Sequence, residues 1–301
     1  MEGERVREGK LVDDAGNVFP ITAFIPRFVP AENYCESFTV EWDKWRDILS
    51  SYTGYGERFV KETKWPDDLV GEVMLEAGCG SGAFTEHALK TGAMVVSFDF
   101  STGVETNYAR NGSAPNLLVV QASIFDMPFA DGAFDRVFCF GVIQHTPDPR
   151  GGFGKLLDVL KPGGSVAVDI YLDPPDWAHL ERAKYFWRGK LAGKYEPAKL
   201  LRYVETYVRM AWPVVRLIES TPLRKLNRWA LFDNYKPRLP GMDPSRYKEF
   251  AALDIFDFLS PAYDAPETVE GFKAWFIESG LDQVDVHQGY NGVEGRGIKA
   301  A

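Results

Sequence analysis

Short apolar runs alternate with amphipathic stretches through the middle of this 301-residue chain. The apolar runs predict five strands, over residues 73–76, 94–98, 117–121, 136–140 and 165–171. Between these runs, apolar positions recur at helical spacing, for example over 83–89 and 153–160. Strands that alternate with helices in this way indicate an α/β fold whose parallel sheet is covered on both faces.

The pattern changes on both sides of this alternating stretch. Before it, prolines interrupt an irregular lead-in, and an aromatic-rich helix is predicted over 38–52. After it, helices are predicted over 177–191, 197–218 and 223–232. The chain ends with a predicted helix over 266–279 and two predicted strands, over 284–288 and 293–298.

These patterns divide the chain into four parts. We expect a doubly wound sheet of seven strands with a helical insert after the fifth strand. The predicted parts are an N-terminal lead-in and lid (1–70), a sheet core (71–172), a helical cap over a substrate (173–263), and a C-terminal helix with the last two strands (264–301).

Charge is unevenly distributed along the chain. The formal net charge is −9, so the whole molecule is not expected to attract nucleic acid. From Leu172 to Lys248, however, 16 Lys and Arg oppose 8 Asp and Glu, which gives +8 there and −17 across the rest. This local excess fits either the basic outer faces of amphipathic helices or a surface that faces an anionic ligand.

The three cysteines show no spacing typical of a metal site or a disulfide framework. Cys35, Cys79 and Cys139 are therefore expected to be free thiols in a reducing cytoplasm, and no metal is predicted. The charged N-terminus has no apolar signal-peptide core, and no stretch approaches the roughly 20 apolar residues of a membrane span. We expect a cytoplasmic protein without integral membrane contact, and its oligomeric state stays open.

A glycine-rich turn follows the first predicted strand. The sequence E-A-G-C-G-S-G begins at Glu76, and its glycines are Gly78, Gly80 and Gly82. Glycines at such a turn let the backbone approach a ligand closely, and the next helix offers unpaired N–H groups. Nicotinamide dinucleotide sites use the same physics, but in their G-x-G-x-x-G fingerprint the third glycine comes one residue later.

An acidic residue ends the second predicted strand. Asp99 lies 17 residues beyond Gly82, where a carboxylate can accept hydrogen bonds from both hydroxyls of a ribose. The alternative is a helix N-cap, since Ser101 and Thr102 follow. The glycine turn just upstream favours the ribose interpretation.

These segments resemble the class I S-adenosylmethionine-dependent methyltransferases, which have a Rossmann-like fold. Three later segments extend the resemblance in the same order: Q-A-S-I-F-D-M-P-F from Gln121, F-D-R-V-F-C-F-G-V-I-Q-H-T-P-D-P from Phe134, and L-K-P-G-G, a turn, from Leu160. The resemblance is strong over roughly 73–171 and looser from 266 onward. It departs from the family at Ser123, where an acid is common.

The resemblance implies S-adenosylmethionine as cofactor. Glu76 to Gly82 would hold its methionine and ribose parts, and Asp99 its ribose hydroxyls. Phe100 would pack either on the adenine or in the core. The implied cofactor-binding residues are Glu76, Gly78, Cys79, Gly80, Gly82, Asp99, Phe100, Ser123, Ile124 and Phe140, with the Ile124 backbone N–H facing the adenine.

The N-terminal residues narrow the resemblance. F-P-I-T-A-F-I-P-R-F, from Phe19 to Phe28, is similar to the exit from a small zinc-ribbon module that precedes some bacterial small-molecule members. In that pattern C-x-x-C-G stands just upstream, whereas Val12 and Ala15 occupy the cysteine positions here. We therefore expect a degenerate module without zinc.

Candidates for proton transfer lie near the ends of the fourth and fifth predicted strands. His145 follows the fourth strand, at the edge where ligands bind in open α/β sheets, and imidazole titrates near neutrality. Alternatively, it only fastens the turn that follows. Asp169 shares a strand face with Tyr171 and is either within reach of substrate or a structural acid.

The predicted function is methyl transfer to oxygen or nitrogen of a small acceptor. The positive insert indicates an acceptor with phosphate or carboxylate, or, less strongly, peripheral contact with a membrane surface. Tyr34, Phe38 and Trp42 would help to close the site, unless they serve only packing. Two alternatives stay open: a non-catalytic subunit that binds S-adenosylmethionine, and a nicotinamide-dependent oxidoreductase, which the glycine spacing disfavours.

Overall fold

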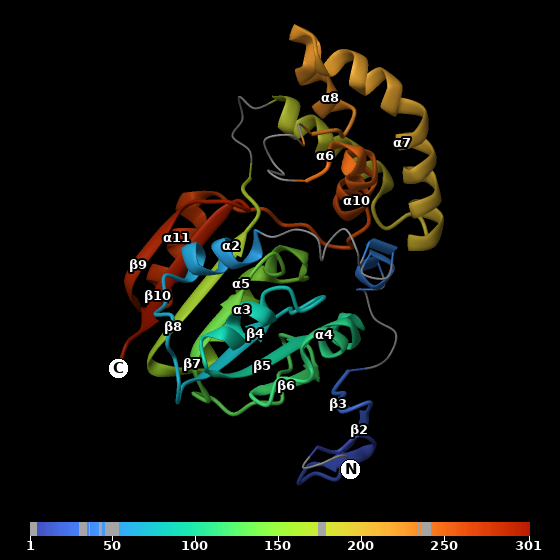
Figure 1. The fold of residues 1–301 in the computed structure, drawn as a ribbon. Helices are drawn as coiled ribbons and strands as arrows, with labels where there is room; N and C mark the ends of the chain where they lie inside the picture. Colours follow the sequence, from blue (N-terminus) through green and yellow to red (C-terminus); the bar gives the residue numbers. More distant parts are fainter. Residues whose placement is uncertain are drawn as a thin grey trace. The chain divides into compact units, whose positions relative to one another are not determined.

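The chain forms two compact units (Figure 1). The computed structural model describes residues 5–29, 35, 37–41, 44–45, 54–173, 179–233, 235 and 242–301. The first unit, called here the sheet unit, comprises Met1–Asn33, Thr53–Asp173 and Tyr263–Ala301. The second, the helical unit, comprises Tyr34–Tyr52 and Pro174–Ala262.

A seven-stranded sheet in the order β6-β5-β4-β7-β8-β10-β9 forms the centre of the sheet unit. Its strands are β4 (Val73–Ala77), β5 (Met94–Asp99), β6 (Leu117–Gln121), β7 (Phe134–Cys139), β8 (Leu160–Ile170), β9 (Leu281–Gln288) and β10 (Val293–Lys299). Strands β4 to β8 are parallel, and β10 is antiparallel to both of its neighbours. This topology confirms the Rossmann-like, doubly wound fold with a helical insert after the fifth strand of the sheet. The strand order reverses between β4 and β7, where such sheets bind ligands.

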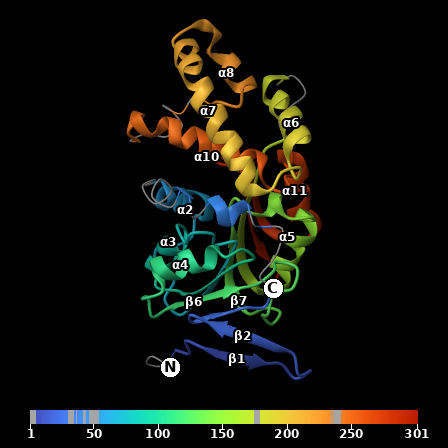
Figure 2. The same cartoon turned by 90° about the vertical axis from the view of Figure 1, so that its right-hand side faces the viewer.

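Helices cover both faces of this sheet (Figure 2). They are α2 (Tyr55–Thr63), α3 (Thr85–Lys90), α4 (Gly103–Asn111), α5 (Pro149–Asp158) and α11 (Val269–Glu278). Because successive strand side chains point to opposite faces, Leu75 packs in the core with α5 and α11, whereas Met74 packs with α2, α3 and α4. Because both faces of the sheet are buried, the strand sequences are continuous apolar runs.

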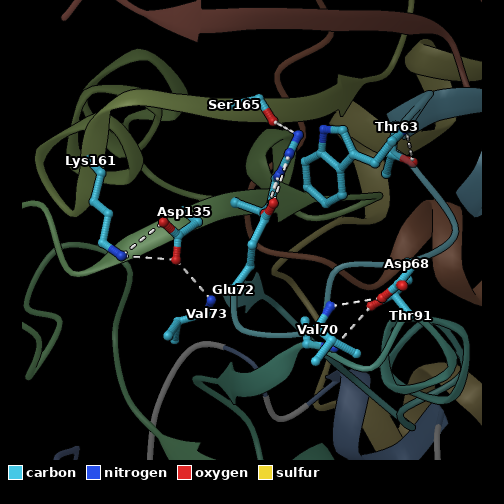
Figure 3. Close-up of polar contacts among 12 residues, drawn as sticks. Thr63, Asp68, Val70, Glu72, Val73, Thr91, Asp135, Lys161 and Ser165 are labelled. Carbon is cyan, nitrogen blue, oxygen red and sulfur yellow. Dashed lines mark hydrogen bonds and ion pairs between the residues drawn. The ribbon is translucent and has the colours of Figure 1, made fainter.

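The amino ends of the central strands are fastened by polar side chains (Figure 3). Asp135 accepts a hydrogen bond from the Val73 N–H at 2.9 Å and pairs with Lys161 at 2.8 Å. Beside it, Arg136 pairs with Glu72 at 2.6 Å and donates to Ser165 at 2.8 Å. This fastening joins β4, β7 and β8 at the edge opposite to the predicted ligand-binding edge.

Two parts of the sheet unit differ from the prediction. The N-terminal lead-in is not irregular: β1 (Gly9–Val12), β2 (Val18–Thr22) and β3 (Ile25–Pro26) form an antiparallel sheet. Pro20 has no N–H to donate, but its carbonyl still accepts the Arg27 N–H at 2.9 Å. The fifth strand begins at Leu160 instead of 165, because Leu160 pairs with Phe134 before a register shift.

The helical unit has its own apolar core. Its longer helices are α6 (His179–Leu191), α7 (Pro197–Glu219) and α10 (Tyr247–Leu259), and the short η2 (Pro222–Lys225) leads into α8 (Leu226–Trp229). The core includes Trp45, Val208, Phe232 and Phe256. The helix predicted over 223–232 is shorter in the structure, where α8 covers only Leu226–Trp229. Of the helix predicted over 38–52, the structure describes only residues 37–41 and 44–45. No helix in the described ranges is long and apolar enough to cross a membrane.

The aromatic cluster beneath α11 gives a test of the fold. Phe276 is fully buried, with its ring centroid 4.7 Å from Phe153, whereas its neighbour Ile277 is 57% exposed. We expect Phe276→Ala to lower the free energy of unfolding by about 3–5 kcal/mol through the lost contacts and the cavity. The control Ile277→Ala should change it by less than about 0.5 kcal/mol. Denaturant titration followed by circular dichroism measures both; equal effects would contradict this packing.

Candidate functional site

The turn after β4 is joined to the end of β5 by backbone hydrogen bonds. The N–H groups of Gly78 and Cys79 both donate to the Phe98 carbonyl, at 2.8 and 2.9 Å. The Gly80 N–H donates to the Asp99 carboxylate at 2.8 Å. The Ala122 N–H, at the end of β6, donates to the Asp99 carbonyl at 3.1 Å. Three adjacent strand ends are therefore held together at the carboxyl edge of the sheet.

The glycines of this turn satisfy two constraints. Gly78, Gly80 and Gly82 have φ of 77°, 46° and 77°, which favours glycine at each position. A Cβ at Gly78 would also collide with Val142, and one at Gly82 with Asn107 of α4. Part of the motif thus serves close packing of the turn against its neighbours, in addition to any approach to a ligand.

Asp99 organises the turn with most of its hydrogen-bonding capacity. Besides the Gly80 N–H, it accepts the Ser101 N–H at 2.8 Å and the Ser101 hydroxyl at 2.6 Å. It is not the cap of α4, whose N-cap residue is Thr102. Burial raises the pKa of Asp99, and these hydrogen bonds oppose the rise. The Phe100 N–H also lowers this pKa by a hydrogen bond. A carboxylate offers about four acceptor positions, so a ribose hydroxyl would share Asp99 with these donors.

Glu76 supports the same turn from inside the protein. It is buried, and its Oε2 accepts hydrogen bonds from Thr85 at 2.5 Å and Ser97 at 2.6 Å. Burial raises the pKa of Glu76 to about 7, although these hydroxyls oppose the rise. Glu76 is thus held by β5 and α3, and its predicted contact with a cofactor stays a prediction.

The loop after β6 holds two predicted adenine contacts. Ser123 is half-buried, and its hydroxyl accepts the Phe125 N–H at 3.2 Å. Ile124 is buried in the core, against Gly152 of α5. On the β4 turn, the Cys79 thiol is also buried, and burial raises its pKa well above the usual value. That shift argues against a reactive thiol here.

Arg58 of α2 is a site residue that the sequence analysis missed. It pairs with Asp169, which is fully buried and also accepts the Gly141 N–H at 2.5 Å. The Arg58 guanidinium lies over the rings of Phe84 and Phe140, 5.0 and 5.8 Å from their centroids. Burial lowers the pKa of Arg58, but the carboxylates beside it dominate and raise it overall. A pair 111 residues apart has no signal in the sequence.

The same ion pair bears on the role of Asp169. Both of its oxygens have partners, one the Gly141 N–H and the other Arg58. Burial raises the pKa of Asp169, and Arg58 opposes the rise. The observed contacts favour a structural acid that fixes Arg58 and the loop after β7.

His145 lies in η1 (Ile143–His145), directly after β7. It is buried, and its Nδ1 is 3.1 Å from the Tyr263 carbonyl oxygen. Its ring packs in a T-shaped arrangement with the ring of Tyr171, with 5.3 Å between the centroids. A carbonyl only accepts, so a neutral imidazole carries its proton on Nδ1 and its lone pair on Nε2. His145 therefore fastens this loop and also keeps the tautomer that a base requires.

Gln144, beside His145, is the second residue that the sequence analysis missed. Its side chain is fully buried, and neither Oε1 nor Nε2 has a hydrogen-bond partner within the described ranges. Its backbone is paired, since its carbonyl accepts the Ala265 N–H at 3.0 Å. An unpaired buried amide destabilises the fold, which is a common feature of functional sites. The only signal in the sequence was its place in the V-I-Q-H segment.

The structure brings most predicted site residues to one edge of the sheet. The β4 turn, Asp99, Ser123, His145 and Asp169 all follow or end parallel strands there. Two predicted lid residues, Tyr34 and Trp42, lie outside the described residues. Among the described residues, no group of His, Cys, Asp and Glu could hold a metal ion.

Residues 75–168 match the family of the methyltransferase domain. A demethylmenaquinone methyltransferase from Clavibacter sepedonicus is 33% identical over 117 residues, which are 38% of this chain and 48% of that protein. A sterol 24-C-methyltransferase from Eremothecium gossypii is 34% identical over 103 residues, 33% of this chain and 28% of that protein. A chain from a Haloferax volcanii complex that contains the Trm112 methyltransferase activator aligns with a TM-score of 0.52 and 12% identity, over 89% of this chain and 98% of that one.

These comparisons classify only residues 75–168 of this chain. This chain spans about half or less of the curated relatives it matches. The matched segment, residues 75–168, resembles a methyltransferase domain. The structural match at 12% identity shows the fold alone. The zinc-ribbon origin of the N-terminal strands stays a prediction.

The unpaired amide of Gln144 predicts a variant that gains stability and loses function. We expect Gln144→Met to raise the free energy of unfolding by about 1–3 kcal/mol, because it removes an unsatisfied buried group. The same variant should bind S-adenosylhomocysteine or transfer methyl groups less well. Gln121 is the matched control, since its amide contacts Arg27 at 2.8 Å and Phe100 at 3.2 Å. Gln121→Met should destabilise; a loss of stability in Gln144→Met would contradict this account.

The raised pKa of Glu76 predicts a specific pH dependence of stability. In the folded protein the pKa of Glu76 is about 7, above its ordinary value of 4.5. The folded state therefore favours the protonated carboxyl, and this contribution to the free energy of unfolding is complete below pH 4.5 and is lost as pH rises through 7. The loss amounts to about 3 kcal/mol. Glu76→Gln is always neutral, so its unfolding free energy should lack this decline. Urea titrations between these pH values test it, and parallel curves for both proteins would refute it.

Proposed function

We propose that this chain, whose residues 75–168 form a methyltransferase domain, transfers the methyl group of S-adenosylmethionine to oxygen or nitrogen of a small acceptor. One observation carries the proposal: the Gly80 N–H and the Asp99 carboxylate join the glycine turn of β4 to the end of β5 at 2.8 Å. This arrangement puts a glycine backbone without side chains beside a carboxylate that accepts hydrogen bonds. A nucleoside needs both features.

The residues of the site perform different tasks in this proposal. When bound, S-adenosylmethionine supplies an electrophilic methyl carbon, so the protein mainly aligns the reactants and excludes water. Asp99 accepts a ribose hydroxyl. The rings of Phe84 and Phe140, 5.4 Å apart, exclude water beside the turn. His145 Nε2 receives the proton that an oxygen or nitrogen acceptor loses.

The acceptor proposed here is a small metabolite with a phosphate or carboxylate group. Support comes from the excess of 16 Lys and Arg over 8 Asp and Glu between Leu172 and Lys248. The curated relatives named above match only about a third of this chain. Their acceptors are therefore not assigned to this protein.

A labelled-methyl experiment tests the proposed activity. Purified chain, incubated with S-adenosylmethionine labelled in its methyl group and a metabolite extract, should transfer label to a small molecule. Asp99→Ala should weaken cofactor affinity by about 1.5–3 kcal/mol, because charge-assisted hydrogen bonds are lost. Calorimetry with S-adenosylhomocysteine measures that loss. The matched control is Asp131→Ala, an exposed acid of the sheet unit.

Each outcome of this experiment discriminates between functions. Labelled product that disappears in Asp99→Ala supports the enzyme. Cofactor binding without product in any extract contradicts catalysis and leaves a cofactor-binding subunit. Binding of NADH, with none of S-adenosylmethionine or S-adenosylhomocysteine, contradicts the domain's assigned cofactor and the proposal together.

A further inference from the structure

Helix α7 displays an apolar stripe on its outer surface. The stripe consists of Tyr203, Tyr207, Met210, Val214 and Leu217, whose side chains are 50%, 38%, 75%, 56% and 72% exposed. The residues follow one another at intervals of four, three, four and three. At about 100° per residue they fall within one narrow face of the helix.

This stripe is separate from the face by which α7 packs into the helical unit. The core face consists of Leu200, Val204, Val208 and Val215, all buried. An amphipathic helix needs only one apolar face to join a core, and the opposite surface is normally polar. Tyr203 and Tyr207 also pack on rings of the helical unit. The exposure of Met210, Val214 and Leu217 is not explained by folding. Exposed patches of this kind mark contact with another surface.

The apolar surface continues onto the segment that follows. Leu223, Leu226 and Trp229 of η2 and α8 are 59%, 50% and 52% exposed. The Tyr207 hydroxyl donates to the Ala230 carbonyl at 2.6 Å, which fixes the end of α8 beside the stripe. Figures 1 and 2 both show α8 returning alongside α7.

Basic residues accompany this surface. Between Pro197 and Trp229 the chain has seven Lys or Arg and two Glu, a net charge of +5 in a protein of net charge −9. Arg202, Arg209 and Arg216 recur every seven residues, so they form an exposed row along α7. Arg216 pairs with Glu219 at 2.9 Å across an exposed surface, where such pairs are weak.

We propose that the stripe, with Leu223, Leu226 and Trp229, binds the surface of a membrane that contains anionic lipids. Apolar and aromatic side chains enter the boundary between headgroups and acyl chains, and Arg and Lys contact the phosphates. A second copy of this chain is a poorer occupant, because two faces of net charge +5 would repel each other. This contact lies within the helical unit and goes beyond the proposed methyl transfer.

Vesicle flotation of the full chain tests the proposal. The protein should float with vesicles of phosphatidylcholine and phosphatidylglycerol, and much less with phosphatidylcholine alone. Rising salt should release it, because screening weakens the attraction to phosphates. Each basic residue near the surface contributes about fivefold to the binding constant, so Arg202→Gln with Arg209→Gln should lower binding by about 25-fold.

Variants of the stripe separate apolar insertion from simple charge attraction. Met210→Ser with Leu217→Ser should abolish flotation while circular dichroism stays unchanged, since both side chains are largely exposed. The matched control, Val70→Ser with Ile277→Ser, removes two residues of 76% and 57% exposure from the sheet unit and should float as the wild type does.

Three results would overturn the proposal. The wild-type chain does not float with the anionic vesicles, or the stripe and control variants float equally well. The third result is that the wild-type chain sediments as a dimer in sedimentation velocity, whereas the variant Met210→Ser with Leu217→Ser sediments as a monomer. That dimer would show a second copy to be the occupant of the stripe.

Discussion

The hydrogen bond from the Gly80 N–H to the Asp99 carboxylate is the contact on which the site depends. It links the turn after β4 to the end of the neighbouring strand β5 at 2.8 Å. The turn requires positive φ at its three glycines, a conformation that has a cost for any other residue. Asp99 therefore has two tasks, because the acid that stabilises this turn is also the one that faces a ribose in our proposal.

Several buried polar groups at the site lower the stability of the folded state. Glu76 is buried with a pKa raised to about 7, and Gln144 has no hydrogen-bond partner in the described part of the chain. Asp169 is fully buried and relies on Arg58 for its compensating charge. The opposite edge of the sheet, with the Asp135 and Lys161 pair, supplies ordinary satisfied contacts. The carboxyl edge thus includes groups that conflict with local stability, as expected of a functional site.

The sequence predicted the parts of this protein that local patterns determine. Strand periodicity and the glycine turn were sufficient for the sheet and its likeness to methyltransferases. The N-terminal strands were missed because prolines normally interrupt strands, whereas Pro20 stays within β2 and its carbonyl accepts the Arg27 N–H. The contact of Arg58 with Asp169 was missed because 111 residues separate them. The roles of His145 and Asp169 depended on partners that no sequence spacing specifies.

A crystal structure of the chain with S-adenosylhomocysteine tests the central claim most directly. Our account predicts the nucleoside beside Gly78, Gly80 and Gly82, with a ribose hydroxyl donating to Asp99 while the Gly80 N–H keeps its bond. A nucleoside bound at another edge of the sheet would contradict the account. So would a ribose out of hydrogen-bonding reach of Asp99.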